Sequence, residues 1–468
     1  MSLTKSEFDI LADGGSVDFG LPADPGAISP DGIFFTNIFF TTTGGGNSGT
    51  VPQGVSSLNV VDDIGEFDNN AEFIVRNSTV TVGDDLTLRE TQDSIISLSG
   101  SGTTVTMAGT SSSGSNDVRL SAQQGSESTN FIFVSDGASL VFADVANKGK
   151  SINVGVNEGA EQDGATIEPG GKSVDSTMII EGAGTTVSIP DSGGDRGTMT
   201  IGQIRDAEDG VVDPTTGRTA DALVVVRDGA QVDIRQNVQI GRVDDDTDGD
   251  ATGALIVEGT GTVFNIGQTG APGNAGFMRV AENGGTGYLV IRDGAQFNML
   301  ASTEREDGIQ LSGASDRPGG EAHAVVTGSG TRLFIEEGYI DVGNNDGTAT
   351  FELSDGAELA ARRMSVALGG TAEAVITGAG TIADFTQGDG NVEIATLDDS
   401  EGRSTDVTGT LTVSDGASVE VGGFVGIADT RGVEGGSATG TLIIEGAGTE
   451  FSVGSDDGTG DDGFMRVA

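Results

Sequence analysis

The amino-acid sequence predicts an all-β fold, a right-handed parallel β-helix (β-solenoid) of at least twelve coils with an N-terminal cap. Two short phrases alternate along the chain, apolar residues flank them with the period of two that strands show, and 78 of the 468 residues are glycine. A unit of two or three short strands cannot bury its own apolar face, so stacked neighbours must supply the core. We expect residues 1–55 to form the cap and residues 56–468 the repeat domain.

The first phrase is Asp-Gly-Ala after an apolar run, and it predicts a tight turn between two strands. Glycine permits the positive φ that such turns need, and an aspartate side chain can bond back to the backbone. Its copies begin at Asp136, Asp228, Asp293, Asp355 and Asp415, and Arg76-Asn77-Ser78-Thr79 is a degenerate copy.

The second phrase is Gly-x-Gly-Thr, again between an apolar run and a segment that alternates polar and apolar residues. Its copies begin at Gly100, Gly182, Gly259, Gly328, Gly378 and Gly446, and they interleave strictly with the first phrase. The distances between phrases vary while the flanking pattern stays fixed, which indicates a common frame with loops of different length. A propeller would need four strands per blade and more even spacing, and a disordered chain would not repeat apolar runs at fixed offsets from turns.

The first 55 residues do not follow the repeat. Thr4 and Glu7 have capping-box spacing, and the apolar residues after them predict a helix of one or two turns that ends at Gly14-Gly15. Ile33-Phe34-Phe35 and Ile38-Phe39-Phe40 then predict strands. We interpret this segment as the cap that covers the open edge and core of a solenoid, with an aromatic adhesive patch as the alternative.

The last residues repeat an internal segment. Gly463-Phe464-Met465-Arg466-Val467-Ala468 is identical to Gly276-Phe277-Met278-Arg279-Val280-Ala281, which continues into further repeats. We therefore expect either a fragment truncated within a longer array or an end that stacks on another molecule. The start carries no apolar signal-peptide segment, so we expect export through a type I-like system that reads a C-terminal signal.

Charge and composition exclude several classes of function. Lys and Arg number 23 against 72 Asp and Glu, for a formal net charge of −49, which repels nucleic acid and anionic lipid surfaces and attracts divalent cations. The chain has no cysteine, no tryptophan and one histidine, so thiol chemistry, Cys/His zinc sites and disulfides are excluded. No apolar run is long enough for a membrane span, so we expect no membrane insertion.

One acidic segment has the spacing of a calcium loop. Asp244, Asp246 and Asp248 stand at its positions 1, 3 and 5, Gly249 stands at position 6, and Asp250 follows. Position 12 of the loop is leucine and not the bidentate glutamate of an EF-hand, so a helical EF-hand is excluded. Ca²⁺ bound by Asp244, Asp246, Asp248 and Asp250 in a loop between coils is the hypothesis, and a solvated acidic loop is the alternative.

Catalytic residues are not evident, and we expect a protein that is not an enzyme. Arg227 and Arg292 stand at the same repeat position, directly before the Asp-Gly-Ala turn, which indicates a recurring surface pair and not a unique site. His323 beside Glu321 has the chemistry of a general base, but neighbouring copies carry ordinary strand residues there, so we expect a histidine on the surface of a strand. Aromatic residues that stack on sugars are scarce.

The alternation of Leu-Thr-Val-Ser-Asp-Gly-Ala with Leu-Ile-Ile-Glu-Gly-Ala-Gly-Thr resembles the repeats of large bacterial surface proteins. These are the autotransporter-passenger repeats and the related type V secretion and PEP-CTERM-associated repeats, and the resemblance covers residues 70 to 468. It implies an extracellular, adhesin-like stalk.

The function we expect is therefore that of a non-catalytic extracellular or cell-surface structural or adhesive protein, a rigid stalk that displays variable acidic loops and is stabilised by calcium. Its expected partners are divalent cations, cell-surface glycans and other copies of itself. Two alternatives stay open: a self-assembling matrix or filament subunit that stacks end to end, and a polysaccharide lyase or hydrolase.

Overall fold

The computed structural model divides the chain into two compact units, and each is described by itself. The first comprises Met1–Thr4, Val17–Ile256 and Gly261–Asn265, and the second comprises Lys5–Ser16, Val257–Thr260 and Ile266–Ala468. The structure describes residues 3–12, 15, 17, 23–41, 57–60, 63–83, 86–88, 94–109, 116–123, 128–143, 150–158, 173–190, 197–205, 217–244, 249–267, 276–300, 308–312, 319–344, 346–388, 390–398, 406–431, 436–454 and 463–467.

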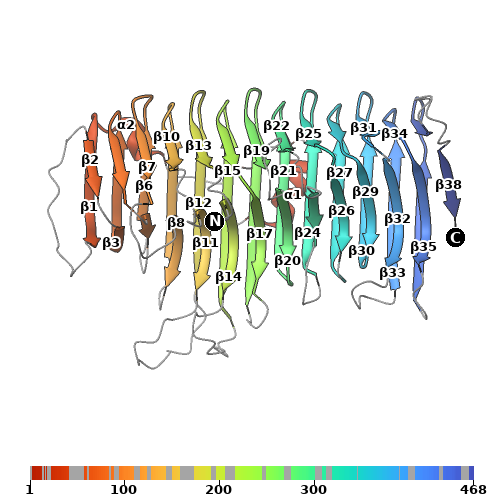
Figure 1. The fold of residues 1–468 in the computed structure, drawn as a ribbon, viewed down its shortest axis with the longest axis horizontal. Coiled ribbons are helices and arrows are strands. Elements are labelled where there is room, and N and C mark those ends of the chain that lie inside the picture. The colour runs from red at the N-terminus through yellow and green to blue at the C-terminus, as the bar shows by residue number, and fades with distance from the viewer. Residues whose placement is uncertain are drawn as a thin grey trace. The chain divides into compact units, whose positions relative to one another are not determined.

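Each unit is a parallel β-solenoid in which every coil contributes three strands, so the predicted fold class is confirmed. The described strands from β3 to β38 make twelve such coils. Strands of neighbouring coils pair in parallel and in register, as in Thr177 with Leu223 in the first unit and Ala324 with Phe351 in the second. Figure 1 shows the strands of successive coils side by side within each unit.

Five coils lie wholly in the first unit. Their first strands are β3 (Asp63–Arg76), β6 (Ser94–Ser99), β9 (Ser128–Ser135), β12 (Ser173–Glu181) and β15 (Thr219–Arg227). Their second strands are β4 (Thr79–Val82), β7 (Thr104–Met107), β10 (Ser139–Phe142), β13 (Thr186–Ile189) and β16 (Gln231–Ile234). Their third strands are β5 (Leu86–Leu88), β8 (Asn116–Gln123), β11 (Lys150–Glu158), β14 (Gly197–Arg205) and β17 (Asn237–Val243).

The chain passes from one unit to the other within the coil of β18 (Asp250–Glu258), β19 (Val263–Gly267) and β20 (Phe277–Glu282). Six coils lie wholly in the second unit. Their first strands are β21 (Thr286–Arg292), β24 (Glu321–Thr327), β27 (Thr348–Ser354), β30 (Thr371–Thr377), β33 (Asp406–Ser414) and β36 (Ser437–Ile444). Their second strands are β22 (Gln296–Leu300), β25 (Arg332–Ile335), β28 (Glu358–Ala360), β31 (Ile382–Phe385), β34 (Ser418–Val421) and β37 (Glu450–Val453). Their third strands are β23 (Gly308–Leu311), β26 (Tyr339–Asn344), β29 (Arg363–Leu368), β32 (Asn391–Asp398), β35 (Phe424–Arg431) and β38 (Phe464–Val467).

The N-terminal segment contributes helix α1 (Lys5–Ala12), helix α2 (Pro25–Ile28) and strands β1 (Gly32–Thr41) and β2 (Ser57–Val60). Strand β1 runs antiparallel to β3, and β2 pairs in parallel with β4, so the two cover the edge of the first coil. The side chain of Asp24 caps α2 and also accepts hydrogen bonds from Ser97 and Ser135, at 2.5 and 2.6 Å. The helix α1 belongs to the second unit, where it packs on β21.

The two alternating phrases occupy the same corner of successive coils, between the first and second strands. At the Asp-Gly-Ala corner the aspartate and the glycine both have positive φ, as at Asp228 (57°) and Gly229 (83°). The third residue points into the core, where Ala230 is fully buried. At the Gly-x-Gly-Thr corner a buried threonine follows two glycines, and the rows of buried alanine and threonine alternate through each unit, with Thr185 next to Ala138 in the ladder.

The threonine hydroxyl of a Gly-x-Gly-Thr corner locks it to the Asp-Gly-Ala corner before it, and we call this bond the threonine lock. Thr185 Oγ1 donates to the carbonyl oxygen of Glu181 at 2.7 Å and accepts from the backbone N–H of Gly137 at 2.9 Å. The same backbone N–H to threonine bond recurs at the corners of Thr262, Thr331, Thr381 and Thr449. A hydroxyl can donate and accept at once, and the small alanine beside it leaves room, which explains why the phrases alternate.

A second recurring feature bends nine of the described third strands. One residue after the apolar run of that strand has positive φ, and at Gly202 an added Cβ would lie 2.3 Å from the carbonyl oxygen of Thr252. The same position with positive φ is occupied by Gly155, Gly241, Ala281, Ser312, Gly343, Ala367, Ala395 and Ala428. The left-handed residue therefore bends the strand and changes the direction in which the side chains after it point.

Candidate binding surface

The predicted calcium loop is described only at its two ends. Asp244 follows β17, and its Oδ1 accepts from Gln203 Nε2 at 2.9 Å and lies 2.9 Å from Arg242 Nε. Asp250 begins β18, where its backbone N–H bonds to the carbonyl oxygen of Arg218. Asp246 and Asp248 lie outside the described residues, and among the residues that are described no group of three His, Cys, Asp or Glu side chains could hold a metal ion. A cation at Asp244 would therefore compete with Arg242 for the same oxygen.

The outward side of the third strands in the second unit carries aromatic and charged side chains in register. Tyr339 of β26 pairs with Arg363 of β29, whose guanidinium carbon lies 4.9 Å from the centre of the tyrosine ring. Asp341 lies beside them, 3.5 Å from Arg363 Nη2, and is buried. Burial raises the pKa of Asp341, and the nearby Arg363 acts in the opposite direction. Burial likewise raises the pKa of Tyr339.

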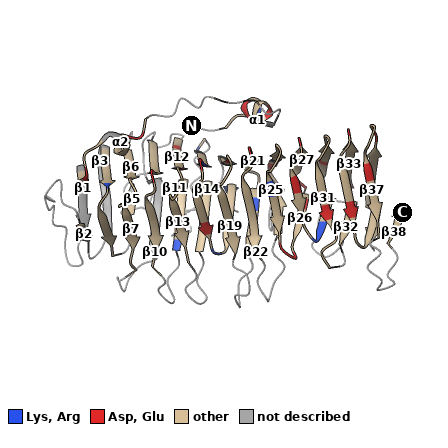
Figure 2. Ribbon diagram, turned by 90° about the horizontal axis from the view of Figure 1, so that it is seen from above, with Lys and Arg blue, Asp and Glu red and all other residues tan. Residues whose placement is uncertain are grey.

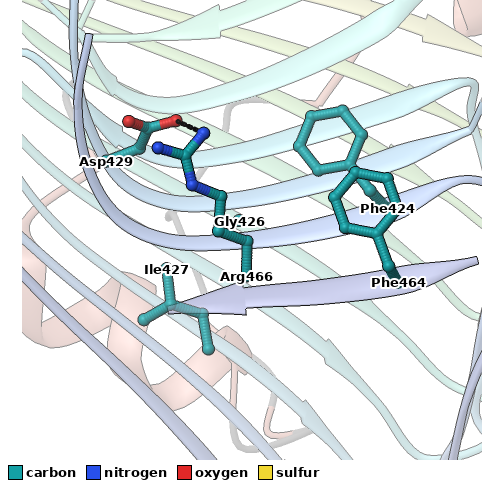
Figure 3. Close-up of a pocket in the computed structure, with 6 residues that line it drawn as sticks. All are labelled: Phe424, Gly426, Ile427, Asp429, Phe464 and Arg466. Atoms are coloured by element: carbon teal, nitrogen blue, oxygen red, sulfur yellow. Dashed lines mark ion pairs between the residues drawn. The ribbon is translucent and has the colours of Figure 1, made fainter. Parts of the chain in front are cut away.

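The same outward side forms an open hollow at β35 and β38. Phe424 and Phe464 stack with ring centres 5.6 Å apart and planes 12° apart. Arg466 and Asp429 form an ion pair at 3.8 Å beside them, and Gly426 and Ile427 complete the lining. Figure 3 shows the two rings on one side of the hollow and the ion pair on the other. Phe464 is 58% exposed and the side chain of Arg466 is 64% exposed, whereas that of Asp429 is only 13% exposed, so an aromatic ring and a guanidinium group face solvent together.

The recurring arginines form recurring ion pairs within each unit. Arg227 contacts Glu181 at 2.6 Å, and Arg292 contacts Glu258 at 2.6 Å, with the glutamate in both cases directly before a Gly-x-Gly-Thr corner. Each pair therefore joins the two corner types of adjacent coils. Because Arg227 and Glu181 are about a third exposed, water screens their attraction, and such pairs contribute on the order of 1 kcal/mol or less. This geometry fits the predicted surface pair.

The prediction for His323 is wrong, because its side chain is only 2% exposed. Its Nδ1 lies 2.7 Å from Thr350 Oγ1 and its Nε2 lies 2.9 Å from Glu321 Oε1. The imidazole stacks on Tyr288 with ring centres 5.3 Å apart, and the ring of Phe8 from α1 lies against both. Burial lowers the pKa of His323 and raises that of Tyr288 to about 12. The sequence comparison with neighbouring coils missed this site because the covering helix comes from outside the repeat.

The hollow and its ring pair were also missed from the sequence. Phe464 belongs to the segment that repeats residues 276–281, but its partner Phe424 stands in a stretch with no phrase of its own. The two residues begin consecutive third strands, β35 and β38, and pair directly, although loops of different length precede them. The part of the chain that the structure describes contains no helix long and apolar enough to cross a membrane.

Comparisons with known proteins add little to this geometry. The sequence matches no protein family and no curated protein. A solved structure of a hyper-glycosylated TibA fragment aligns over 82% of this chain and 100% of that fragment, with 13% identity and a TM-score of 0.18. At this TM-score the two backbones do not superpose closely enough to infer a common fold or function.

Proposed function

We propose that the protein is a non-catalytic extracellular structural protein, a stiff β-solenoid spacer that presents its outward side chains for adhesion. The observation that carries this proposal is the threonine lock between successive corners. It adds a half-buried side-chain bond to the continuous backbone ladders at alternate coil boundaries, so the two coils that it joins cannot separate without breaking both. Repetition of a structural bond favours a mechanical role over a single reactive site.

Pulling single molecules of the full chain tests the mechanical role. Attached at its two ends, the protein should resist extension up to a threshold force and then lengthen in steps of one or two coils. Thr381→Val removes the lock between two coils of the second unit, so it should lower the force of the first step. Thr386→Val, outside the corner, is the matched control. Smooth extension at low force, the same in all variants, would exclude a spacer.

Adhesion is tested on the hollow of β35 and β38. Aromatic rings offer an apolar face and charged side chains offer hydrogen bonds to a sugar, and the half-buried Phe424 and the exposed Phe464 line one hollow with Arg466. Beads coated with the protein should be retained under flow on surfaces that carry acidic or neutral glycans, and Phe424→Ala should reduce the retention. Equal retention of the variant on every glycan would remove the hollow from the proposal.

The two alternative functions predict different outcomes. A filament subunit gives particles whose length grows with protein concentration in light scattering, whereas a spacer stays at the mass of one chain. A polysaccharide lyase or hydrolase gives new unsaturated or reducing ends when incubated with alginate or pectin, and the spacer gives none.

A further inference from the structure

The outer face of β21 and β24 is buried, unlike that of the strands that follow them in the same sheet. Residues of β30 alternate between buried and exposed or half-buried, as expected for a strand with one face in the core. In β21 and β24 all the residues between the first and the last are buried. Something therefore covers the outer face of these two strands in the second unit.

The two strands present apolar side chains to that cover. Val290 and Val325 are paired in register at an outward position, and both are buried. The next residue in the same row, on β27, is Glu352. The outward row is thus apolar under the cover, carries a carboxylate one coil further on, and is apolar again at the half-buried Val375 of β30.

Helix α1 is the cover. It packs on β21, as Figure 2 shows, and its Phe8 ring lies 5.2 Å from the ring of Tyr288 and 5.3 Å from that of His323. Phe8 and Leu11 are buried, whereas Ile10 on the other side of the helix is 44% exposed. After the helix, the carbonyl oxygen of Gly15 accepts from Arg292 Nη1 at 2.7 Å. A helix of eight residues is too short to be stable alone, so its order depends on this contact.

His323 lies in the centre of the contact and is surrounded by charged groups of both signs. Lys5 and Asp9 approach from α1, Tyr288 from β21 and Glu321 from β24 itself, and β27 contributes the hydroxyl of Thr350. Glu321 is half exposed, so water weakens its attraction for a protonated imidazole. Burial under Phe8 disfavours the imidazolium, and this effect outweighs the hydrogen bond to Glu321, so the pKa of His323 is lowered.

We propose that α1 is a detachable cover over the apolar outer face of β21 and β24, and that protonation of His323 loosens it, so that acidification releases the helix from this face. The undocked imidazole returns to water and binds its proton more tightly than the docked one. The cover is therefore tightest above the pKa of the undocked histidine, and it weakens as the pH falls through that value towards the pKa of the docked form.

The test uses the full chain and its single histidine. The imidazole proton signals in NMR report the pKa of His323 without assignment, in the wild type and in Phe8→Ala, which lacks the ring that holds the cover. The pKa should be lower in the wild type. The protection of amides 5–12 against hydrogen exchange, measured by mass spectrometry and corrected for the intrinsic exchange rate, should fall between pH 7.5 and pH 5, by up to about tenfold for each unit by which the two pKa values differ.

Two further variants make the result decisive. Ile10→Ala changes the exposed side of α1 and should leave the pKa of His323 unchanged. His323→Gln should abolish the pH dependence of exchange in residues 5–12, after correction for the intrinsic rate. An equal or higher pKa in the wild type than in Phe8→Ala, or a pH dependence that persists in His323→Gln, would overturn the proposal.

Discussion

A single hydroxyl explains the most regular feature of this chain. At the Gly-x-Gly-Thr corners from Thr185 onward, the threonine hydroxyl accepts a backbone N–H from the corner before it, and at Thr185, Thr381 and Thr449 it also donates to its own strand. Without that oxygen, the backbone N–H of the glycine in the Asp-Gly-Ala corner would lose its hydrogen-bond acceptor. Leaving a donor unsatisfied in this way costs about 1–3 kcal/mol.

Replacing the threonine should show this cost. Thr185→Val keeps the shape of the side chain but removes the acceptor of Gly137, so we expect the free energy of unfolding to fall by about 1–3 kcal/mol. Urea unfolding followed by circular dichroism measures it. Thr186→Val is the matched control, since that half-buried hydroxyl bonds only to Ser139 and its loss should cost less. Equal effects of the two substitutions would contradict the lock.

An acidic side chain provides a test of pH dependence. Burial raises the pKa of Asp221, and Asp175, its partner in register on β12, raises it further. A raised pKa means that the folded state prefers the protonated form. The penalty for ionising Asp221 is therefore complete above its folded pKa and disappears below the unfolded value of 3.8.

Asp221→Asn should therefore stabilise the protein at pH 7, and the gain should shrink as the pH approaches 3. Midpoints of thermal unfolding measured from pH 3 to pH 7 check the sign. Asp233→Asn, on the neighbouring second strand, is the control. A gain that does not change with pH would contradict the assigned cause.

At the scale of the element, the third strands depend on one left-handed residue. Glycine at this position in the first unit is required where a neighbouring backbone approaches, as at Gly202, whereas Ala367 adopts the same φ in the second unit. The positive φ therefore recurs at this position in both units. Whether glycine or alanine stands there depends on the room that the neighbouring backbone leaves for a Cβ atom.

Gly202→Ala should destabilise the protein by more than about 2 kcal/mol, because the left-handed φ costs an alanine about 1–2 kcal/mol and the new methyl group meets the carbonyl of Thr252. Ala367→Gly should change stability by less than about 1 kcal/mol, since relief of strain and added flexibility of the unfolded chain oppose each other. Denaturant unfolding midpoints measure both changes. Similar losses of stability in the two variants would contradict the idea that the room beside the Cβ atom selects the residue.

The strands and corners could be predicted from the sequence, whereas the contacts of the N-terminal segment could not. Period-two runs around glycine turns repeat often enough to fix the coil. The phrases alone do not reveal that both occupy one corner, because the third strand between them has no phrase of its own. The spacing of Thr4 and Glu7 predicts the helix that contains Phe8. A capping pattern gives no information about the strand on which the helix packs, so the contact with Tyr288 could not be predicted.

For the whole molecule, charge is the dominant property that the sequence dictates. A net charge of −49 opposes compaction through self-repulsion, so screening by salt or divalent cations should stabilise both units. The candidate calcium ligands are a separate matter, since Asp244 already pairs with Arg242 and Asp246 and Asp248 lie outside the described residues.

Calcium binding is expected to raise the midpoint of thermal unfolding more than magnesium does at equal concentration. Saturation at a hundredfold excess over the dissociation constant stabilises a folded state by about 2.7 kcal/mol. Far-UV circular dichroism in chelator, in millimolar calcium and in millimolar magnesium measures the rise. The double substitution Asp246→Asn and Asp248→Asn should remove the calcium-specific part only, and an equal small rise with both ions would indicate screening alone.

The alternation of corners also limits how many coils a deletion or a duplication can remove or add. Deleting one coil, such as residues 348–370, would place two Gly-x-Gly-Thr corners in succession and leave Thr381 without the glycine N–H it accepts. Deleting two, such as residues 348–407, would restore the original neighbours. The unit of duplication is therefore the pair of coils. The identical segments at Gly276 and Gly463 fit this rule, since the coils that contain them lie six coils apart along the chain, which is an even number. Arrays of this kind would lengthen or shorten by gene duplication or loss in steps of two.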